Sequence, residues 1–352
     1  MMGPLEVSVG LVVVALTLRD VFDTVIVPGE SQGLLRVLRR MLSAFLPVWK
    51  YARRRRSGIS TSFGPFALVA AFVTWMLLLL FSFGAMAHGL GQYFSPSADS
   101  YAQGVFIAGT SLAAIGPSGI QASGLARWVI VASGFCGLAV LTMAVTYLIQ
   151  MHQGISNRDA TVLKITTTAG EPPSALAILE RYAILDCRTE IGEVLRNGRE
   201  WCSSVHQSHA SHPSLIYFRS VGAGAGWPAT LGALIDLALI AELLMEETAN
   251  KGTAVLLRQE GVRLLQDINR LIGLKAGIAS TTAADVLNLS NRLSAAGYTV
   301  RCPIDAAEFA RRRCEHAAAI QAIASHLGTS EAPLLLARGG LQRGILDPVQ
   351  RS

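Results

Sequence analysis

Apolar residues gather in the first 150 residues of this 352-residue chain, where they form three long runs. The runs cover about Leu5–Val27, Phe66–Ala87 and Ala126–Gln150, and the second of them contains no charged residue. About 20 such residues are enough to cross a bilayer as a helix. No basic segment precedes the first run, so we expect it to be retained as a span and not cleaved as a signal peptide.

A shorter apolar segment, Ser100–Ile120, lies between the second and third runs and ends in a Gly-Pro-Ser-Gly turn. It is mostly too short to cross a bilayer. Non-helical backbone is tolerated at membrane depth only where protein or a water-filled cavity covers it. We therefore predict a re-entrant pore helix and loop, preceded by an external turret over His88–Asp99.

The first linker combines an amphipathic helix with a basic run. Apolar residues recur every three or four positions through Gly33–Tyr51, which is typical of a helix lying in the membrane interface. Residues 28–62 contain eight Lys or Arg and one acid, so their net charge of +7 exceeds the +6 of the whole chain. We expect Arg53, Arg54, Arg55 and Arg56 to bind anionic lipid, with a solvated linker as the alternative. Nucleic acid is not an expected partner.

The charge distribution also predicts the orientation. Loops rich in Lys and Arg stay on the cytoplasmic side, so the 28–62 loop should be cytoplasmic. This places the N-terminus and residues 88–125 outside, and the C-terminal half in the cytoplasm. Residues 88–125 contain few basic residues, in agreement.

Two features inside the spans allow alternative interpretations. Arg19 and Asp23 lie four residues apart, so on a helix they can pair as a structural contact or, alternatively, take part in ion permeation. Gly134 and Gly137 in the third span can act as a gating hinge or allow close helix packing.

After residue 151 the composition becomes that of a soluble helical domain. No alternating strand pattern appears, and breakers separate helical patterns over 174–196, 227–250, 253–272, 281–296 and 305–327. The expected parts are an N-terminal transmembrane helix with its basic interfacial segment (1–62), a pore module (63–151), a linker (152–173), a cytosolic helical domain (174–328) and a loose tail (329–352). The fold class is thus an all-α membrane protein with three transmembrane helices, a re-entrant pore helix and loop, and a C-terminal cytosolic helical domain.

Two segments of the C-terminal half could be read as membrane-associated. Trp227–Met245 is apolar enough to be considered as a fourth span, but Asp236 and Glu242 interrupt it, so we predict a buried core helix. The run Arg311–Arg313 is expected to be a solvated or lipid-facing helix surface.

Possible chemistry in the C-terminal half is sparse. His206, His209 and His212 recur every third residue, but no cysteine or acid joins them at ligand spacing, so a structural role is favoured over a metal site. The Gly-rich GAGAGW segment, 222–227, lacks the spacing of a dinucleotide loop and is read as a turn. The five cysteines show no C-x-x-C spacing and are expected to be reduced. No enzyme, metal or cofactor is predicted.

The order span, turret, pore helix, glycine-bearing turn and span resembles the pore module of the two-transmembrane potassium-channel superfamily. More broadly, the chain is similar to bacterial potassium channel family proteins that carry an extra N-terminal helix with a D-x-x-x-T segment, here Asp20 to Thr24. The resemblance covers residues 63–151 and implies a multi-pass protein of the cell inner membrane. Because each chain supplies one pore loop, it also implies a homotetramer.

The filter of that superfamily reads T-x-x-T-V-G-Y-G-D, and this chain departs from it. The corresponding residues are Ala114, Ile115, Gly116, Pro117, Ser118 and Gly119. The substitutions remove a hydroxyl that coordinates the ion, a glycine and an acid. Proline fixes φ, and serine is expected to be strained where the second glycine stood.

Thr110 and Ser111, at the end of the pore helix, are the remaining hydroxyls of the pore loop. They either line the inner mouth or bond back within the helix, the second being favoured.

The resemblance and its departures together predict a potassium-channel-like ion channel with altered or weak potassium selectivity. Its permeant species would be a monovalent ion. The alternative is a non-conducting membrane scaffold or sensor that keeps the channel fold.

Overall fold

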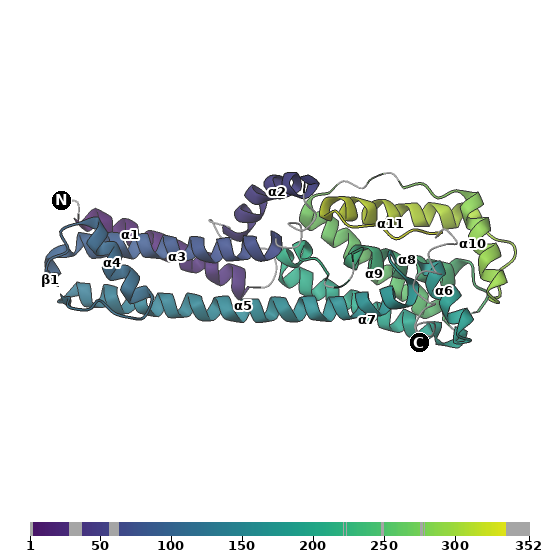
Figure 1. The fold of residues 1–352 in the computed structure, drawn as a ribbon, viewed down its shortest axis with the longest axis horizontal. Helices are drawn as coiled ribbons and strands as arrows, with labels where there is room; N and C mark the ends of the chain where they lie inside the picture. The colour runs from purple at the N-terminus through teal and green to yellow at the C-terminus, as the bar shows by residue number, and fades with distance from the viewer. Residues whose placement is uncertain are drawn as a thin grey trace, which may run out of the picture. The chain divides into compact units, whose positions relative to one another are not determined.

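The computed structural model describes residues 3–27, 37–55 and 63–335, apart from 221, 223, 248–249, 275–276 and 278. The chain divides into two compact units, Met1–His152 and Gln153–Ser352. Both units are built mainly from helices (Figure 1), so the all-α expectation is confirmed for the described residues.

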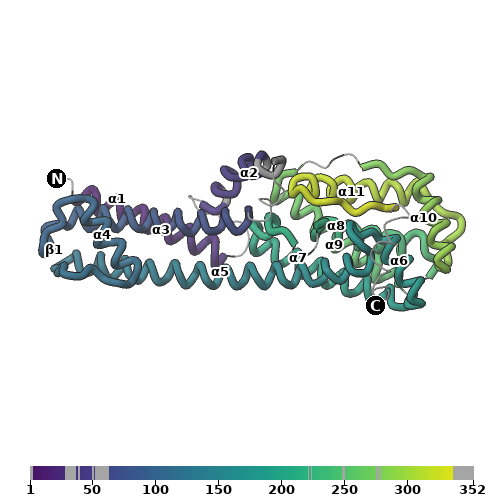
Figure 2. The backbone as a smooth tube through the Cα atoms, in the orientation of Figure 1, coloured from purple at the N-terminus to yellow at the C-terminus, as the bar shows by residue number. Residues whose placement is uncertain are grey.

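The first unit contains four helices and the start of a fifth. A 3-10 turn, Gly91–Tyr93, and a two-stranded antiparallel ribbon lie between α3 and α5, and the ribbon pairs Phe94 with Ala122 and Ser95 with Gln121. Figure 2 shows the backbone turning back at α4 before it enters α5. The elements are α1 (Gly3–Val25), α2 (Val37–Arg55), α3 (Phe63–Gly89), β1 (Phe94–Ser95), α4 (Tyr101–Leu112), β2 (Gln121–Ala122) and α5 (Leu125–Ala169).

Three described helices are long and apolar enough to cross a membrane, namely α3, α5 and α8 (Gly226–Leu243). Two of them, α3 and α5, are spans that the sequence predicts. The third predicted span, α1, is 23 residues long but includes four charged residues. These are Glu6, Arg19, Asp20 and Asp23.

Glycines allow α4 to lie in close contact with both α3 and α5. A Cβ atom on Gly104 of α4 would come within 2.5 Å of the carbonyl oxygen of Gly84 on α3. A Cβ atom on Gly137 of α5 would overlap the carbonyl oxygen of Leu112, the last residue of α4. Helix packing is therefore the structural reason for Gly137, and its role as a hinge stays a prediction.

The apolar stripe of the amphipathic helix packs against the start of α3. Phe45 of α2 meets Phe66 edge-on with ring centroids 5.2 Å apart. Trp49 stacks on Phe63 at 4.8 Å and is buried. The predicted amphipathic helix thus exists, and part of its apolar face is covered by protein.

The second unit is a bundle arranged around α8. In the part of the chain that the structure describes, 94% of the apolar window of α8 is buried, and its core neighbours include Leu195, Leu257 and Phe309. The prediction of a buried core helix here is confirmed. The other helices are α6 (Ala175–Ile184), α7 (Ile191–Ser211), α9 (Lys251–Ile272), α10 (Ala283–Ala295) and α11 (Ala306–Leu327), with 3-10 turns at Arg188–Glu190 and Pro213–Tyr217.

Two predicted boundaries in this half differ from the structure. The pattern over 174–196 forms two helices, because α6 ends at Ile184 and Asp186 takes a left-handed φ of 56°. Such a backbone angle interrupts a right-handed helix. In the predicted linker, α5 continues as a helix to Ala169, and only a short segment separates it from α6.

Changing each α5 glycine to alanine separates close packing from helix propensity. Alanine favours a helix over glycine by about 1 kcal/mol, and Gly134 has room for a Cβ, its nearest neighbour being 3.4 Å away. We expect Gly134→Ala to keep or raise the thermal midpoint of the purified chain in detergent. Gly137→Ala should lower stability by about 1–3 kcal/mol, because its Cβ overlaps Leu112. Equal midpoints for the two variants would contradict the packing role of Gly137.

Candidate functional site

The short helix α4 is built to begin and end at fixed residues. Ser100 caps its start by accepting from the backbone N–H of Gln103, whose side chain accepts from the Ser100 N–H in return. This reciprocal capping box satisfies two otherwise unpaired donors at the helix start. Tyr101 then donates to the carbonyl oxygen of Phe81 on α3 at 3.1 Å. The start of α4 is therefore anchored to its neighbour as well as to itself.

The two hydroxyls at the end of α4 bond back within the helix, as favoured from the sequence. Thr110 donates to the carbonyl oxygens of Phe106 and Ile107, both at 3.0 Å, and Ser111 donates to that of Ile107 at 2.8 Å. Backbone groups rather than these hydroxyls thus shape the turn that follows. The carbonyl oxygen of Thr110 accepts from the N–H groups of Ile115 and Gly116.

The loop after α4 has an irregular backbone with left-handed residues. φ is 58° at Ala114, 80° at Gly116 and 73° at Gly119. A non-glycine residue rarely adopts a positive φ, so Ala114 is strained. The strain expected at Ser118 is wrong: among the described residues it lies at Ala114, and the left-handed position falls on Gly119 instead.

This loop is held at both ends and uncovered between them. Beyond it, β2 pairs with β1, and the Ser123 hydroxyl donates to the carbonyl oxygen of Tyr93 at 3.0 Å. Between these anchors the side chain of Ile115 is 78% exposed in the single chain. An isoleucine this exposed, beside irregular backbone and an apolar span, is typical of a surface that something else covers.

A buried carboxylate joins three helices of the first unit, and the sequence analysis did not identify it. Asp20 of α1 is 1% exposed, and its Oδ2 accepts from Trp75 Nε1 at 2.8 Å and from the Val37 N–H at 3.2 Å. It therefore links α1 to α3 and to the first residue of α2. The only signal in the sequence was an acid inside an apolar run.

The other charges of α1 also have partners. The expected pair of Arg19 and Asp23 is confirmed, with Nε and Oδ2 3.7 Å apart. Near the other end of the helix, Glu6 lies 2.8 Å from His88 of α3. The predicted lipid-binding run falls mostly outside the description: Arg56 lies outside the described residues, and Arg53–Arg55 end α2 without described side chains.

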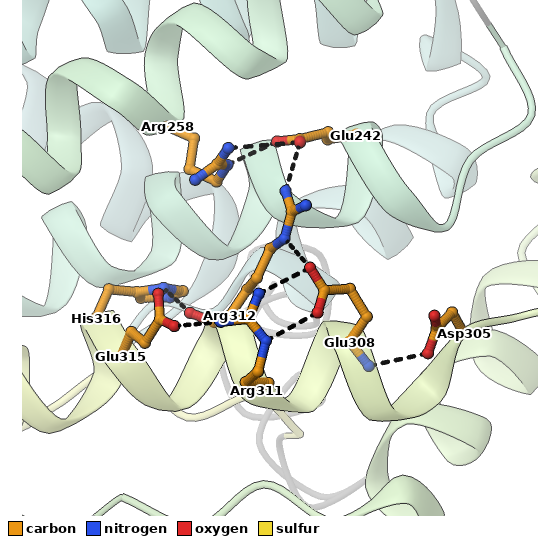
Figure 3. Close-up of polar contacts among 8 residues, drawn as sticks. All are labelled: Glu242, Arg258, Asp305, Glu308, Arg311, Arg312, Glu315 and His316. Carbon is orange, nitrogen blue, oxygen red and sulfur yellow. Dashed lines mark hydrogen bonds and ion pairs between the residues drawn. The ribbon is translucent and has the colours of Figure 1, made fainter.

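The second unit contains a network of ion pairs around the acids of α8 (Figure 3). Glu242 is largely buried and accepts from Arg258 Nε at 2.6 Å and from Arg312 Nη1 at 2.9 Å. Arg311 and Arg312 both donate to Glu308, and these hydrogen bonds lower the pKa of Glu308 to about 2. The network ties α11 to α8 and α9.

Deeper in the same bundle, Asp236 of α8 lies between two partners from α11. Arg313 donates to it from Nε at 3.1 Å and from Nη2 at 3.0 Å, and His316 Nε2 lies 2.8 Å away. Burial raises the pKa of Asp236, but Arg313 and His316 outweigh burial and hold it below its ordinary value.

The expectation of a solvated or lipid-facing surface at Arg311–Arg313 is therefore wrong for part of the run. The side chain of Arg311 is 60% exposed, whereas that of Arg313 is 9% exposed. Arg313 faces inward because the buried carboxylate of Asp236 needs a cation. That requirement comes from a residue 77 positions earlier in the chain.

The three histidines predicted to be structural lie in different surroundings. His206 pairs with Asp267 at 2.9 Å and with Glu260 at 3.7 Å. His209 is buried beside Trp227, with its Nδ1 2.8 Å from the carbonyl oxygen of Val205. Within the described ranges, no three His, Cys, Asp or Glu side chains lie close enough to hold a metal ion.

Two smaller predictions concern the glycine-rich turn and the cysteines. The GAGAGW segment is partly described: Gly222 and Gly226 have φ of 79° and 67°, and the N–H of Ala225 donates to Glu171 at 2.5 Å just before α8 begins. The five cysteines are free thiols.

No family model, curated protein or solved structure matches this chain.

Replacing Asp236 with asparagine leaves Arg313 and His316 buried without a counter-charge. Breaking a buried pair in this way costs about 3–5 kcal/mol. We expect Asp236→Asn to lower the free energy of unfolding by that amount, measured by chemical denaturation in detergent. Glu315→Gln is the control, because its side chain is 65% exposed and the pair should contribute less than about 1 kcal/mol. Equal stability of the two variants would rule out a stabilising role for the buried cluster.

His209 makes the stability of the second unit depend on pH. Burial, followed by the nearby charge of Arg158, lowers the pKa of His209 to about 3 from its ordinary value of 6.5. The unfolded chain therefore binds a proton that the folded chain does not, and stability falls as pH drops from 6.5 toward 3.

The expected loss is about 1.4 kcal/mol for each pH unit below 6.5. Denaturation curves at pH 7 and pH 5 measure it. His209→Gln should flatten the dependence, whereas His152→Gln, at an exposed position, should leave it unchanged. The same slope in the His209 variant and the parent would assign the pH dependence to other groups.

Proposed function

We propose that this chain is a potassium-channel-like ion channel that assembles as a homotetramer and has altered or weak potassium selectivity. The observation that carries the proposal is the path α3, ribbon, α4, irregular loop and α5. A short capped helix lies against α3 and ends at α5, and the loop after it returns the chain to the ribbon. Such a loop fits membrane depth only where it lines a cavity.

The exposed surface of α5 supports assembly. In one chain, only 22% of the apolar window of α5 is buried, compared with 39% of that of α3. Large apolar side chains on α5, including Trp128, Phe135 and Leu141, are exposed. Lipid covers part of this surface, and in the proposal further copies of the chain cover the rest. Ile115 would then face neighbouring loops.

The proposal places α1, α3 and α5 across the cell inner membrane, with the N-terminus outside and the second unit in the cytoplasm. Charges inside a span require partners, and those of α1 have them: Glu6 meets His88, Asp20 meets Trp75, and Arg19 meets Asp23. Although α8 is also apolar enough to span, its burial among charged helices supports a core position in a cytosolic bundle.

Weak potassium selectivity follows from the chemistry of the loop. A potassium filter replaces the hydration shell of the ion with closely spaced oxygen atoms. Ala114 offers no hydroxyl, and Thr110 and Ser111 spend theirs on α4 carbonyl groups. Pro117 has no N–H to stabilise a neighbouring carbonyl. Fewer coordinating oxygens lower the advantage of potassium over sodium.

The same departures from the filter favour a second candidate, a non-conducting membrane scaffold or sensor that keeps the channel fold. The strained Ala114 and the fixed φ of Pro117 make a regular stack of carbonyl oxygens harder to form. In this case the loop would serve only to hold the assembly together.

Recordings from purified protein in planar bilayers distinguish the two candidates. We expect cation currents from the natural chain, with a low ratio of potassium to sodium permeability. Restoring T-V-G-Y-G at 114–118 through Ala114→Thr, Ile115→Val, Pro117→Tyr and Ser118→Gly should raise that ratio. Glu193→Gln, on α7, is the matched control and should change neither current nor selectivity.

Absence of current from the natural chain under every cation and anion gradient would contradict the channel proposal. Current from the restored chain alone would support the scaffold.

A further inference from the structure

A cavity of about 370 Å³ lies within the second unit, between α8, α10, α11 and the segment that follows α11. Sites for small molecules span roughly 300–1,000 Å³, so its ligand is small. We propose that this cavity binds a small zwitterion of the α-amino-acid class. Its anionic group would lie on Arg313 and its cationic group at Asp285 and Glu331. This inference concerns the second unit and is independent of the pore.

The inner end of the cavity carries more positive than negative charge. His316 Nε2 lies 2.8 Å from Asp236 Oδ1, and its Nδ1 lies 3.2 Å from the carbonyl oxygen of Arg312. An ionised carboxylate and a carbonyl oxygen only accept, so both ring nitrogens donate and the ring is an imidazolium. Arg313 and His316 therefore supply two cations against the single carboxylate of Asp236. A ligand anion balances the excess.

Arg313 also has a donor to offer. Its Nε and Nη2 groups bond to Asp236 and to the carbonyl oxygen of Ala332, and one Nη1 hydrogen goes to Thr281 Oγ1 at 2.9 Å. In the described parts of the chain, the second Nη1 hydrogen has no acceptor. A carboxylate in the cavity would accept it as a charge-assisted hydrogen bond.

The outer end of the cavity has the opposite charge. Asp285 uses Oδ2 to accept from the Thr282 N–H and hydroxyl, at 2.9 and 2.7 Å. Its Oδ1 and the exposed carboxylate of Glu331 have no partner among the residues that the structure describes. An ammonium group presents three donors and fits between such carboxylates. Charges of opposite sign at the two ends of one cavity match a zwitterion.

The walls between the two ends are largely apolar. Ile320 of α11 and Leu334 of the following segment are buried, and Ala317 adds a small side chain that leaves the space open. A ligand with a short apolar side chain therefore fits better than one with a further charge.

Isothermal titration calorimetry on the full chain in detergent tests the proposal. The probes are L-alanine and L-leucine, each with an analogue that lacks the carboxylate (ethylamine, 3-methylbutylamine) and one that lacks the ammonium (propanoate, 4-methylpentanoate). We expect at least one amino acid to bind, and its two analogues to bind about tenfold more weakly or worse. Binding of neither amino acid, or equal binding of an analogue, would overturn the assignment.

Variants locate the ligand in the cavity. Asp285→Asn combined with Glu331→Gln should weaken binding about tenfold or more, and Ala317→Leu should abolish it by filling the space. These changes leave the pairs of Asp236 with Arg313 and His316 in place, so the fold is retained. The controls, Glu193→Gln and Ala307→Leu, lie at exposed positions away from the cavity and should bind as the parent does. Unchanged binding in the cavity variants would overturn the proposal.

Discussion

Close approach of helix backbones at glycine is the constraint on which the first unit depends. Gly104 brings α4 against the backbone of α3, and Gly137 lets α5 pass the carbonyl end of α4. With α4 held from both sides, the chain after Leu112 can turn sharply and return to the ribbon. The irregular loop is thus a consequence of how tightly the short helix is seated. Its left-handed residues, Ala114 and Gly116, follow directly.

The second unit depends on a different constraint, the neutralisation of acids inside an apolar helix. Asp236 and Glu242 give α8 two charges that cannot be buried alone. Arg313 and His316 satisfy the first, and Arg258 and Arg312 satisfy the second. These pairs fix which faces of α9 and α11 turn inward. The same arrangement leaves an unbalanced positive charge at the cavity, so the means of stabilising the bundle also provides a place for a ligand.

The sequence was informative where a property is local. The apolar runs predicted α3 and α5, the spacing of Arg19 and Asp23 predicted their pairing, and the interruption by Asp236 and Glu242 predicted a core helix. Long-range requirements escaped it. Nothing near Arg313 in the sequence indicates that a carboxylate 77 residues away draws it inward. The break at Asp186 and the exchange of strain from Ser118 to Ala114 depend on backbone angles that composition does not encode.

The account's central claim is that residues 113–119 of several copies line one pore. An image of the assembled protein in a lipid nanodisc, at a resolution that traces the backbone, tests it most directly. The account predicts four copies around an axis, with the carbonyl groups of Ala114 to Gly119 facing that axis and Ile115 covered by a neighbouring chain. A monomer, or an assembly in which this loop faces lipid or solvent away from the axis, would contradict it.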